Sequence, residues 1–245
     1  MLRGRQRYRS HGGIPHGSTN GLGNKLAFYL QNNVGIDATR WYDQGPRGND
    51  ASQGVSGNQA ELSEGGFLFT ASEEDHYDFS EEVEVTNEHE VVIFVVCKLT
   101  STGSNATVLG LNATTHFMQM DGGADNISIK FGGTKTTVSP DDGTNNDFAA
   151  GTKMLITLQR ESGGTGNINL WKNGVLLTQD SQAANPGDGE FISLGTRSGD
   201  RFLDGIIHDI AFVDSGADEG GGLINIGDLT IERMNTYFTS KHGIN

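Results

Sequence analysis

The sequence predicts an all-β fold, in the form of a sandwich built by one domain. A chain of 245 residues is long enough for one large core and does not require a second. Glycine is abundant, at 36 residues, whereas proline numbers only 4. The glycines lie between short apolar runs, a pattern typical of a β protein with many turns.

Apolar segments of strand length recur along most of the chain, with clusters of Gly, Asn, Asp and Ser between them. They cover residues 26–30, 67–69, 91–99, 107–111, 117–120, 127–131, 154–158, 168–171, 191–194 and 206–213. Two hairpins are predicted among them. Asn173-Gly174 supplies the positive φ of a tight turn between residues 167–172 and 175–177. A longer loop joins 117–120 to 127–131.

The run 91–97 is apolar at every position, so both faces of this strand must be covered. The end of the chain is one candidate cover, and a neighbouring subunit, which would make the protein a homo-oligomer, is the other. Cys97 lies in this run and is the only cysteine, which excludes an intrachain disulfide and a cysteine-rich zinc site. We expect its side chain to act as a small buried hydrophobe.

Only the end of the chain predicts a helix, over residues 230–242. Its apolar residues recur at helical spacing, at Ile231, Met234 and Phe238. Thr230 can cap the start, and Gly243 is suited to the position after the last turn. We expect this amphipathic helix to lie against the sandwich, within a domain that spans residues 23–245.

Residues 1–22 predict an extended basic arm. Its arginines are Arg3, Arg5, Arg7 and Arg9, and the first acidic residue of the chain is Asp37. The arm has three interpretations: binding of encapsidated nucleic acid, docking on an acidic protein surface, or a tail without a role. The net charge of −14 argues against a general nucleic-acid partner, because most of the surface would repel phosphates. No apolar stretch follows the charged start and no 18-residue apolar run occurs, so we expect neither a secretory signal nor a membrane partner.

Five segments resemble, in order, the motifs of laminin-G-like domains of the concanavalin A-like lectin/glucanase group. They are Trp41-Tyr42-Asp43 with Gly48-Asn49-Asp50-Ala51, the Phe67 and Tyr77 stretches at 65–69 and 74–79, the Trp171 hairpin at 170–175, Ser193-Leu194-Gly195, and residues 202–213. The resemblance implies a jelly-roll of two antiparallel sheets, with loops at one rim and a concave face that often holds glycans. The closing residues 232–244 resemble a version found in marine bacteriophage structural proteins.

The resemblance implies a non-enzymatic virion structural protein, either a capsid decoration or a tail- or fibre-associated subunit. Residues 1–22 would anchor it to other virion proteins, and the sandwich would bind a polysaccharide or lipopolysaccharide on a host surface. A virion protein assembled in the host cytoplasm needs neither a secretory signal nor disulfides. A bacterial glycan-binding lectin module and a glycoside hydrolase of the laminarinase type are the alternatives.

A glycan site needs exposed aromatic rings that stack on sugars. The candidates are Trp41, Tyr42, His116 and Trp171, although both tryptophans suit the core equally well. Glycanases of this group place two carboxylates on one strand in an E-x-D-x-x-E run. Residues 73–78 are the nearest run here, but its final Asp shortens the reach and it matches a structural turn of the family. We assign no catalytic residue.

Calcium is the one cofactor that the resemblance suggests, and none is required. Related sandwiches often carry a structural calcium ion between a final-strand Asp and groups of an early loop. Asp209 matches that strand position, and Asp43 lies in the early loop. Calcium takes six to eight oxygen ligands, which loops rich in Asp, Asn and Gly can supply. The alternative is that Asp209 only accepts hydrogen bonds from loop amides.

Overall fold

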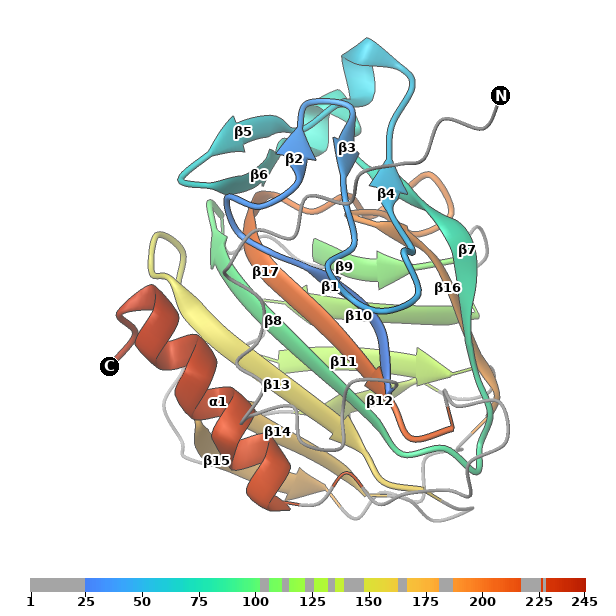
Figure 1. Ribbon diagram of the computed structural model, residues 1–245, viewed down its shortest axis with the longest axis vertical. Helices are drawn as coiled ribbons and strands as arrows, with labels where there is room; N and C mark the ends of the chain where they lie inside the picture. The colour runs from blue at the N-terminus through green and yellow to red at the C-terminus, as the bar shows by residue number, and fades with distance from the viewer. Residues whose placement is uncertain are drawn as a thin grey trace, which may run out of the picture.

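A computed structural model shows two antiparallel β-sheets packed face to face, with one helix outside them (Figure 1). The structure describes residues 25–101, 106–111, 115–121, 126–131, 135–138, 148–162, 167–180, 187–216, 226 and 228–245. The paired strands of both sheets run antiparallel. The predicted all-β sandwich is therefore confirmed, and the ten predicted apolar segments lie in strands, apart from Leu111, which follows the end of its strand.

The first sheet has eight strands in the order β15-β14-β13-β8-β17-β6-β5, with β1 also paired to β17. Their bounds are β1 Leu26–Leu30, β5 Glu61–Ser63, β6 Gly66–Phe69, β8 Val91–Leu99, β13 Met154–Arg160, β14 Ile168–Lys172, β15 Val175–Asp180 and β17 Gly205–Asp214. Two strands share one edge of β17, because β6 pairs with residues 205–207 and β1 with residues 210–213. The changeover falls at a β-bulge that contains His208.

The second sheet has nine strands in the order β12-β11-β10-β9-β16-β7-β4-β3-β2 and lies behind the first in Figure 1. Their bounds are β2 Ile36–Asp37, β3 Arg40–Trp41, β4 Ala51–Ser52, β7 Tyr77–Val85, β9 Ala106–Gly110, β10 His116–Asp121, β11 Asn126–Phe131, β12 Thr136–Val138 and β16 Gly189–Leu194. Two short 3-10 helices, η1 Ser56–Asn58 and η2 Ala71–Glu73, lie in the loops at one rim.

The main core lies between the two sheets, and aromatic rings fill its centre. Phe67 stacks on Tyr77, with ring centroids 4.4 Å apart, and meets Trp41 edge-on at 5.2 Å. Cys97 is buried in this core, as predicted, and burial raises the pKa of its thiol to about 12. The thiol is therefore neutral near pH 7, as expected for a packing residue.

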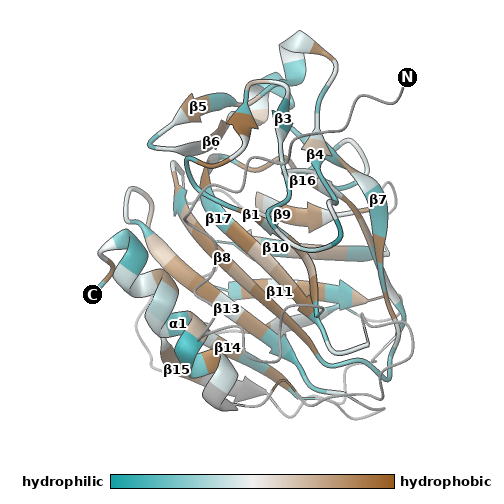
Figure 2. Cartoon of the chain, viewed as in Figure 1, coloured by the Kyte–Doolittle hydropathy of each residue, from teal (hydrophilic) through white to brown (hydrophobic). Residues whose placement is uncertain are grey.

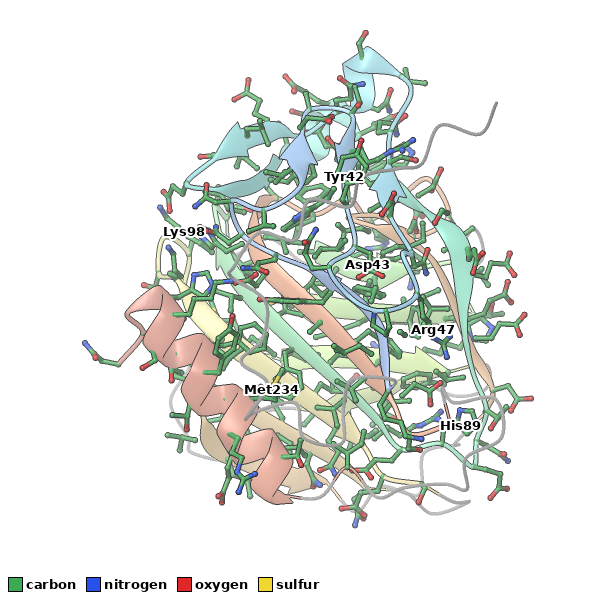
Figure 3. All side chains as sticks on the ribbon, in the orientation of Figure 1. Tyr42, Asp43, Arg47, His89, Lys98 and Met234 are labelled. Carbon is green, nitrogen blue, oxygen red and sulfur yellow. The ribbon has the colours of Figure 1, made fainter. Side chains whose placement is uncertain are left out.

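A second apolar cluster lies on the outer face of the eight-stranded sheet, under helix α1 (Asp228–His242) (Figures 1 and 2). Val92, Phe94 and Val96 of β8 point into it, while the alternate residues of β8 point into the main core. Met234 of α1 is fully buried against these residues (Figure 3). The C-terminal helix therefore covers the second face of this strand, which confirms one of the two predicted covers. A homo-oligomer stays a prediction.

The predicted turns and helix end have the expected backbone. Asn173 and Gly174 have φ of 52° and 83°, and they connect β14 to β15 as a tight hairpin. The predicted hairpin of residues 117–120 and 127–131 is the β10–β11 pair. Helix α1 begins at Asp228, two residues before the predicted start, and Gly243 follows its end with φ of 61°.

The predicted basic arm, with Arg3, Arg5, Arg7 and Arg9, lies outside the described residues. The structure therefore leaves its anchoring role as a prediction. Among the residues that the structure does describe, no helix is both long and apolar enough to cross a lipid bilayer.

Gly66 lies where β6 packs edge to edge against the bulged part of β17, and this contact leaves no space for a side chain. A Cβ at Gly66 would lie 2.0 Å from the carbonyl oxygen of Ile207 and 2.9 Å from Cα of His208. We expect Gly66→Ala to lower the free energy of unfolding by about 1–3 kcal/mol, because two backbones would have to separate. Urea titration measures this. Gly54→Ala is the matched control, since nothing lies within 4 Å of its Cβ, and an equal loss in both variants would contradict the prediction.

Candidate functional site

The outward face of the nine-stranded sheet carries polar side chains arranged in rows by the strand register. Met118 and Leu109 point into the core, so Phe117 and Gln119 on the same strand point outward. One outward row, in register, contains Lys130, Phe117, Gly110, Ser193, Asp78 and Ser52. A second contains Thr137, Ser128, Gln119 and Thr107. Hydroxyls, an amide, charges and one aromatic ring are thus gathered on one face.

The loop that follows β16 crosses this face directly over β9. Gly110 permits the crossing, because a Cβ there would lie 2.1 Å from the carbonyl oxygen of Thr196 and 3.0 Å from Cα of Arg197. The amide of Gly195 donates to the carbonyl of Val108, at 3.0 Å, and holds the loop beside the strand. The loop therefore occupies a fixed position on the outward face.

A tight turn fixes the backbone of Arg197 within this loop. Arg197 and Asp200 exchange two backbone hydrogen bonds, of 3.2 and 2.9 Å. The two residues between them, Ser198 and Gly199, have φ of 56° and 64°. Positive φ at both central positions is the geometry of a type I′ turn. Arg197 is thus placed by backbone geometry before its side chain makes any contact.

The guanidinium of Arg197 rests on the ring of Phe117, with Cζ 4.4 Å from the ring centroid. Its Nη1 lies 3.4 Å from Oε1 of Gln119, whose amide nitrogen donates to Thr107 at 2.9 Å. Its Nε is buried without a hydrogen-bond partner. Burial, followed by the charge of Arg201, lowers the pKa of Arg197, while Asp200 acts in the opposite direction. We call Phe117, Gln119, Lys130 and Arg197 the Arg197 surface.

Sequence reasoning missed the Arg197 surface. Ser198-Gly199 is a turn signal that could have been noticed, since it lies four residues after the 191–194 strand. Nothing local indicates that the turn lies over β9, because that contact joins residues almost ninety positions apart in the sequence.

Trp41 does not belong to a glycan site, which corrects the expectation from sequence. Its side chain is fully buried between the sheets, and its Nε1 donates to the carbonyl of Gln31 at 2.9 Å. A ring with no exposed face cannot stack on a sugar. Tyr42, the next residue, is 42% exposed, with the Arg40 guanidinium 5.4 Å from its ring centroid, and lies among the rim loops (Figure 3).

The other two aromatic candidates lie on different faces. Trp171 is partly buried against the apolar cluster under α1, on the eight-stranded sheet. His116 begins β10 in the other sheet and is half-buried, and burial lowers its pKa with a smaller effect from Lys130. The structure therefore does not bring Tyr42, His116 and Trp171 together into one site.

Asp43 and Asp209, the residues considered for calcium, have different partners. The Asp43 carboxylate accepts the amides of Tyr29 (2.7 Å), Gly45 (2.7 Å) and Asn49 (2.9 Å), and burial raises its pKa. Asp209 is fully buried. It accepts the amide of Asn32 at 2.8 Å, which is the predicted alternative of a carboxylate that satisfies a loop amide.

The same Asp209 carboxylate holds the end of α1. It accepts two hydrogen bonds from Nζ of Lys241, at 2.8 and 3.0 Å, and one contact from Nε2 of His242. With two basic side chains on its oxygens, Asp209 does not fit a calcium ion shared with Asp43. Among the described residues no group of three or more His, Cys, Asp or Glu side chains could hold a metal ion.

The carboxylates of residues 73–78 do not lie on one strand. Glu73 ends η2, Glu74 follows it with φ of 59°, and only Tyr77 and Asp78 belong to β7. Asp75 is buried, accepts the amide of Thr70 at 2.8 Å, and has its pKa raised by burial. A chain turn therefore separates the carboxylates that the glycanase run would need on one face.

Comparison with solved structures shows which fold this arrangement belongs to. The ligand-binding domain of botulinum neurotoxin serotype D, solved in complex with N-acetylneuraminic acid, is similar with a TM-score of 0.59 and 12% identity, over 90% of this chain and 52% of that chain. Trypanosoma rangeli sialidase is similar with a TM-score of 0.56 and 13% identity, over 89% of this chain and 33% of that chain. The protein therefore spans about half of the first structure and a third of the second.

These similarities confirm the two-sheet β-sandwich fold that the family resemblance implies, and they concern the fold alone. No protein-family model and no curated protein matches the sequence. The association with bacteriophage structural proteins stays a prediction.

We expect the melting temperature to be insensitive to calcium and to EDTA, because Lys241 and His242 already occupy the carboxylate oxygens of Asp209. Asp209→Asn should instead lower the free energy of unfolding by about 3 kcal/mol, since it leaves two basic groups without their buried partner. Glu232→Gln, on the exposed face of α1, is the control and should change stability by less than about 0.5 kcal/mol. A clear loss of stability in EDTA would restore the calcium hypothesis.

His208 should make stability fall on acidification. Its side chain is fully buried, both ring nitrogens lack hydrogen-bond partners, and burial followed by the charges of Lys153 and His242 lowers its pKa to about 4. The unfolded chain binds a proton near pH 6.5, whereas the folded chain stays unprotonated. Stability should therefore decrease between pH 6.5 and 4, by at most about 1.4 kcal/mol per pH unit. Urea titrations at several pH values should show a smaller slope for His208→Asn, and equal slopes would refute this assignment.

Proposed function

We propose that this protein is a non-enzymatic carbohydrate-binding module that binds glycans on the Arg197 surface. The observation that carries the proposal is the outward face of the nine-stranded sheet. There the partly exposed Arg197 lies over the buried Phe117 ring, and the rows beside it include the exposed Asp78 and Thr137. Protein sites orient sugars through polar and charged groups that are held in place.

The similar structures supply independent support. One of them is a ligand-binding domain in complex with N-acetylneuraminic acid, a sugar, and it shares the fold over most of this chain. The two faces of the sandwich also differ in a way that favours the nine-stranded sheet. Helix α1 covers the outer face of the eight-stranded sheet with apolar contacts, whereas the Arg197 surface is polar and includes partly exposed groups.

The arrangement of carboxylates supports a role without catalysis. Retaining glycosidases need two carboxyl groups about 5 Å apart on one face. The run 73–78 is divided by a turn. Glu82 and Glu190 do lie together on the nine-stranded sheet, where the charge of Glu190 raises the pKa of Glu82, but Glu82 is fully exposed. If the wild-type protein released reducing sugar and Glu82→Gln abolished that release, the non-catalytic proposal would be overturned.

A finer proposal concerns where the module works. The four arginines of residues 1–22 precede a strongly acidic body, and this charge contrast suits an arm that docks on another protein of a virion. Removal of residues 2–22 would then abolish incorporation into particles while leaving the melting temperature unchanged. Incorporation of the shortened protein at the normal level would contradict the anchoring role.

The glycan proposal predicts saturable binding to at least one polysaccharide in a panel of bacterial surface and algal glycans. Arg197→Ala should weaken that binding by about tenfold or more, because it removes the central group of the surface. Arg233→Ala is the matched control, since Arg233 is an exposed arginine on α1. Calorimetry or affinity electrophoresis gives the dissociation constants. Loss of binding in Tyr42→Ala but not in Arg197→Ala would move the site to the rim loops.

A further inference from the structure

We propose that the Arg197 surface selects acidic glycans, through a carboxylate on the sugar that pairs with the guanidinium of Arg197. This inference rests on the proposed glycan-binding function and goes beyond it by naming the chemical class of the ligand. Three features of the surface carry it: the unsatisfied state of the arginine, its fixed position, and the charges around it.

The hydrogen-bonding capacity of Arg197 is largely unused. A guanidinium has five N–H donors, and with the described residues the Arg197 side chain makes one long hydrogen bond, of 3.4 Å, to Gln119. Its Nε is buried without a partner. No carboxylate of the described residues forms an ion pair with it, although Asp200 interacts with it at longer range. Partial burial of a cation without a counterion is unfavourable, and a ligand carboxylate would offset that cost.

The position of Arg197 is prepared in advance. The type I′ turn holds its backbone, Gly110 lets that turn lie on the sheet, and the Phe117 ring supports one face of the guanidinium. Little side-chain entropy remains to be lost when the fork of N–H groups engages a planar carboxylate. A surface lysine or a freely rotating arginine would lack this preparation.

The nearby charges are of mixed sign, and the charge of Asp200 affects the pKa of Arg197 more than that of Arg201 does. Arg201 lies near enough for its charge to lower the pKa of Arg197, and Lys130 stands opposite Phe117 in the β10–β11 register. Asp200 opposes them near Arg197, and Asp78 lies further along the same row. Arg197 and Lys130 thus place two basic residues next to Phe117, in a chain of net charge −14 where most of the surface would repel an anion.

Polygalacturonate and its fully methyl-esterified form test this inference, because they differ only at the carboxyl group, where the ester replaces the charge by a methyl group. The wild-type protein should bind the acid form about tenfold more tightly than the ester, and added salt should reduce the difference. Arg197→Gln should lose the preference for the acid form while retaining the weaker binding to the ester. Arg197→Lys should recover only part of the preference, since a lysine lacks the planar fork. Arg233→Gln removes the same charge from α1 and should bind like the wild type.

The outcomes separate this inference from the proposed function. Equal binding of acid and ester, both weakened by Arg197→Ala, would overturn the preference for acidic sugars and leave a glycan-binding module. Equally tight binding of dextran sulfate that also depends on Arg197 would overturn the assignment to a carboxylate. No binding of any polysaccharide by the folded protein, with melting temperatures checked for every variant, would overturn both.

Discussion

Both faces of strand β8 have to be kept from water, because the residues that point to either face are apolar. The arrangement of the chain follows from this constraint. Residues of one parity enter the core between the sheets, and those of the other parity need a separate cover. Helix α1 provides it, with Ile231, Met234 and Phe238 buried against the sheet. Asp209 then holds the helix end through Lys241 and His242, so one buried carboxylate joins the last strand to the last helix.

The cover over one sheet leaves the outward face of the other sheet to carry the polar side chains. Apolar residues and a helix occupy the outside of the eight-stranded sheet, whereas hydroxyls, amides and charges occupy the outside of the nine-stranded sheet. A single glycine, Gly110, lets the loop after β16 lie across that face and bring Arg197 onto Phe117. The absence of one Cβ thus permits the contact on which the proposed binding surface depends.

Sequence patterns predicted the strands whose residues are apolar and missed those whose outward residues are charged. Strand β7 is the clearest case, because Asp78, Glu82 and Glu84 alternate with its buried residues and reduce its apolar content.

The aromatic candidates failed for a related reason. Trp41 ends strand β3 with its side chain in the core, whereas the side chain of Tyr42, the next residue, is at the surface. The sequence cannot determine the register of so short a strand.

The sequence by itself determined the all-β class, the two hairpins, the amphipathic C-terminal helix and the need to cover both faces of residues 91–97. These features depend on local backbone preference and on the period of apolar residues, which are properties of short segments. Only the tertiary structure decided that Asp209 pairs with α1, that Trp41 is buried, and that Arg197 lies on Phe117. Each of these features depends on contacts between residues far apart in the chain. Strand register and the path of the loops determine those contacts, and no local sequence pattern encodes either of them.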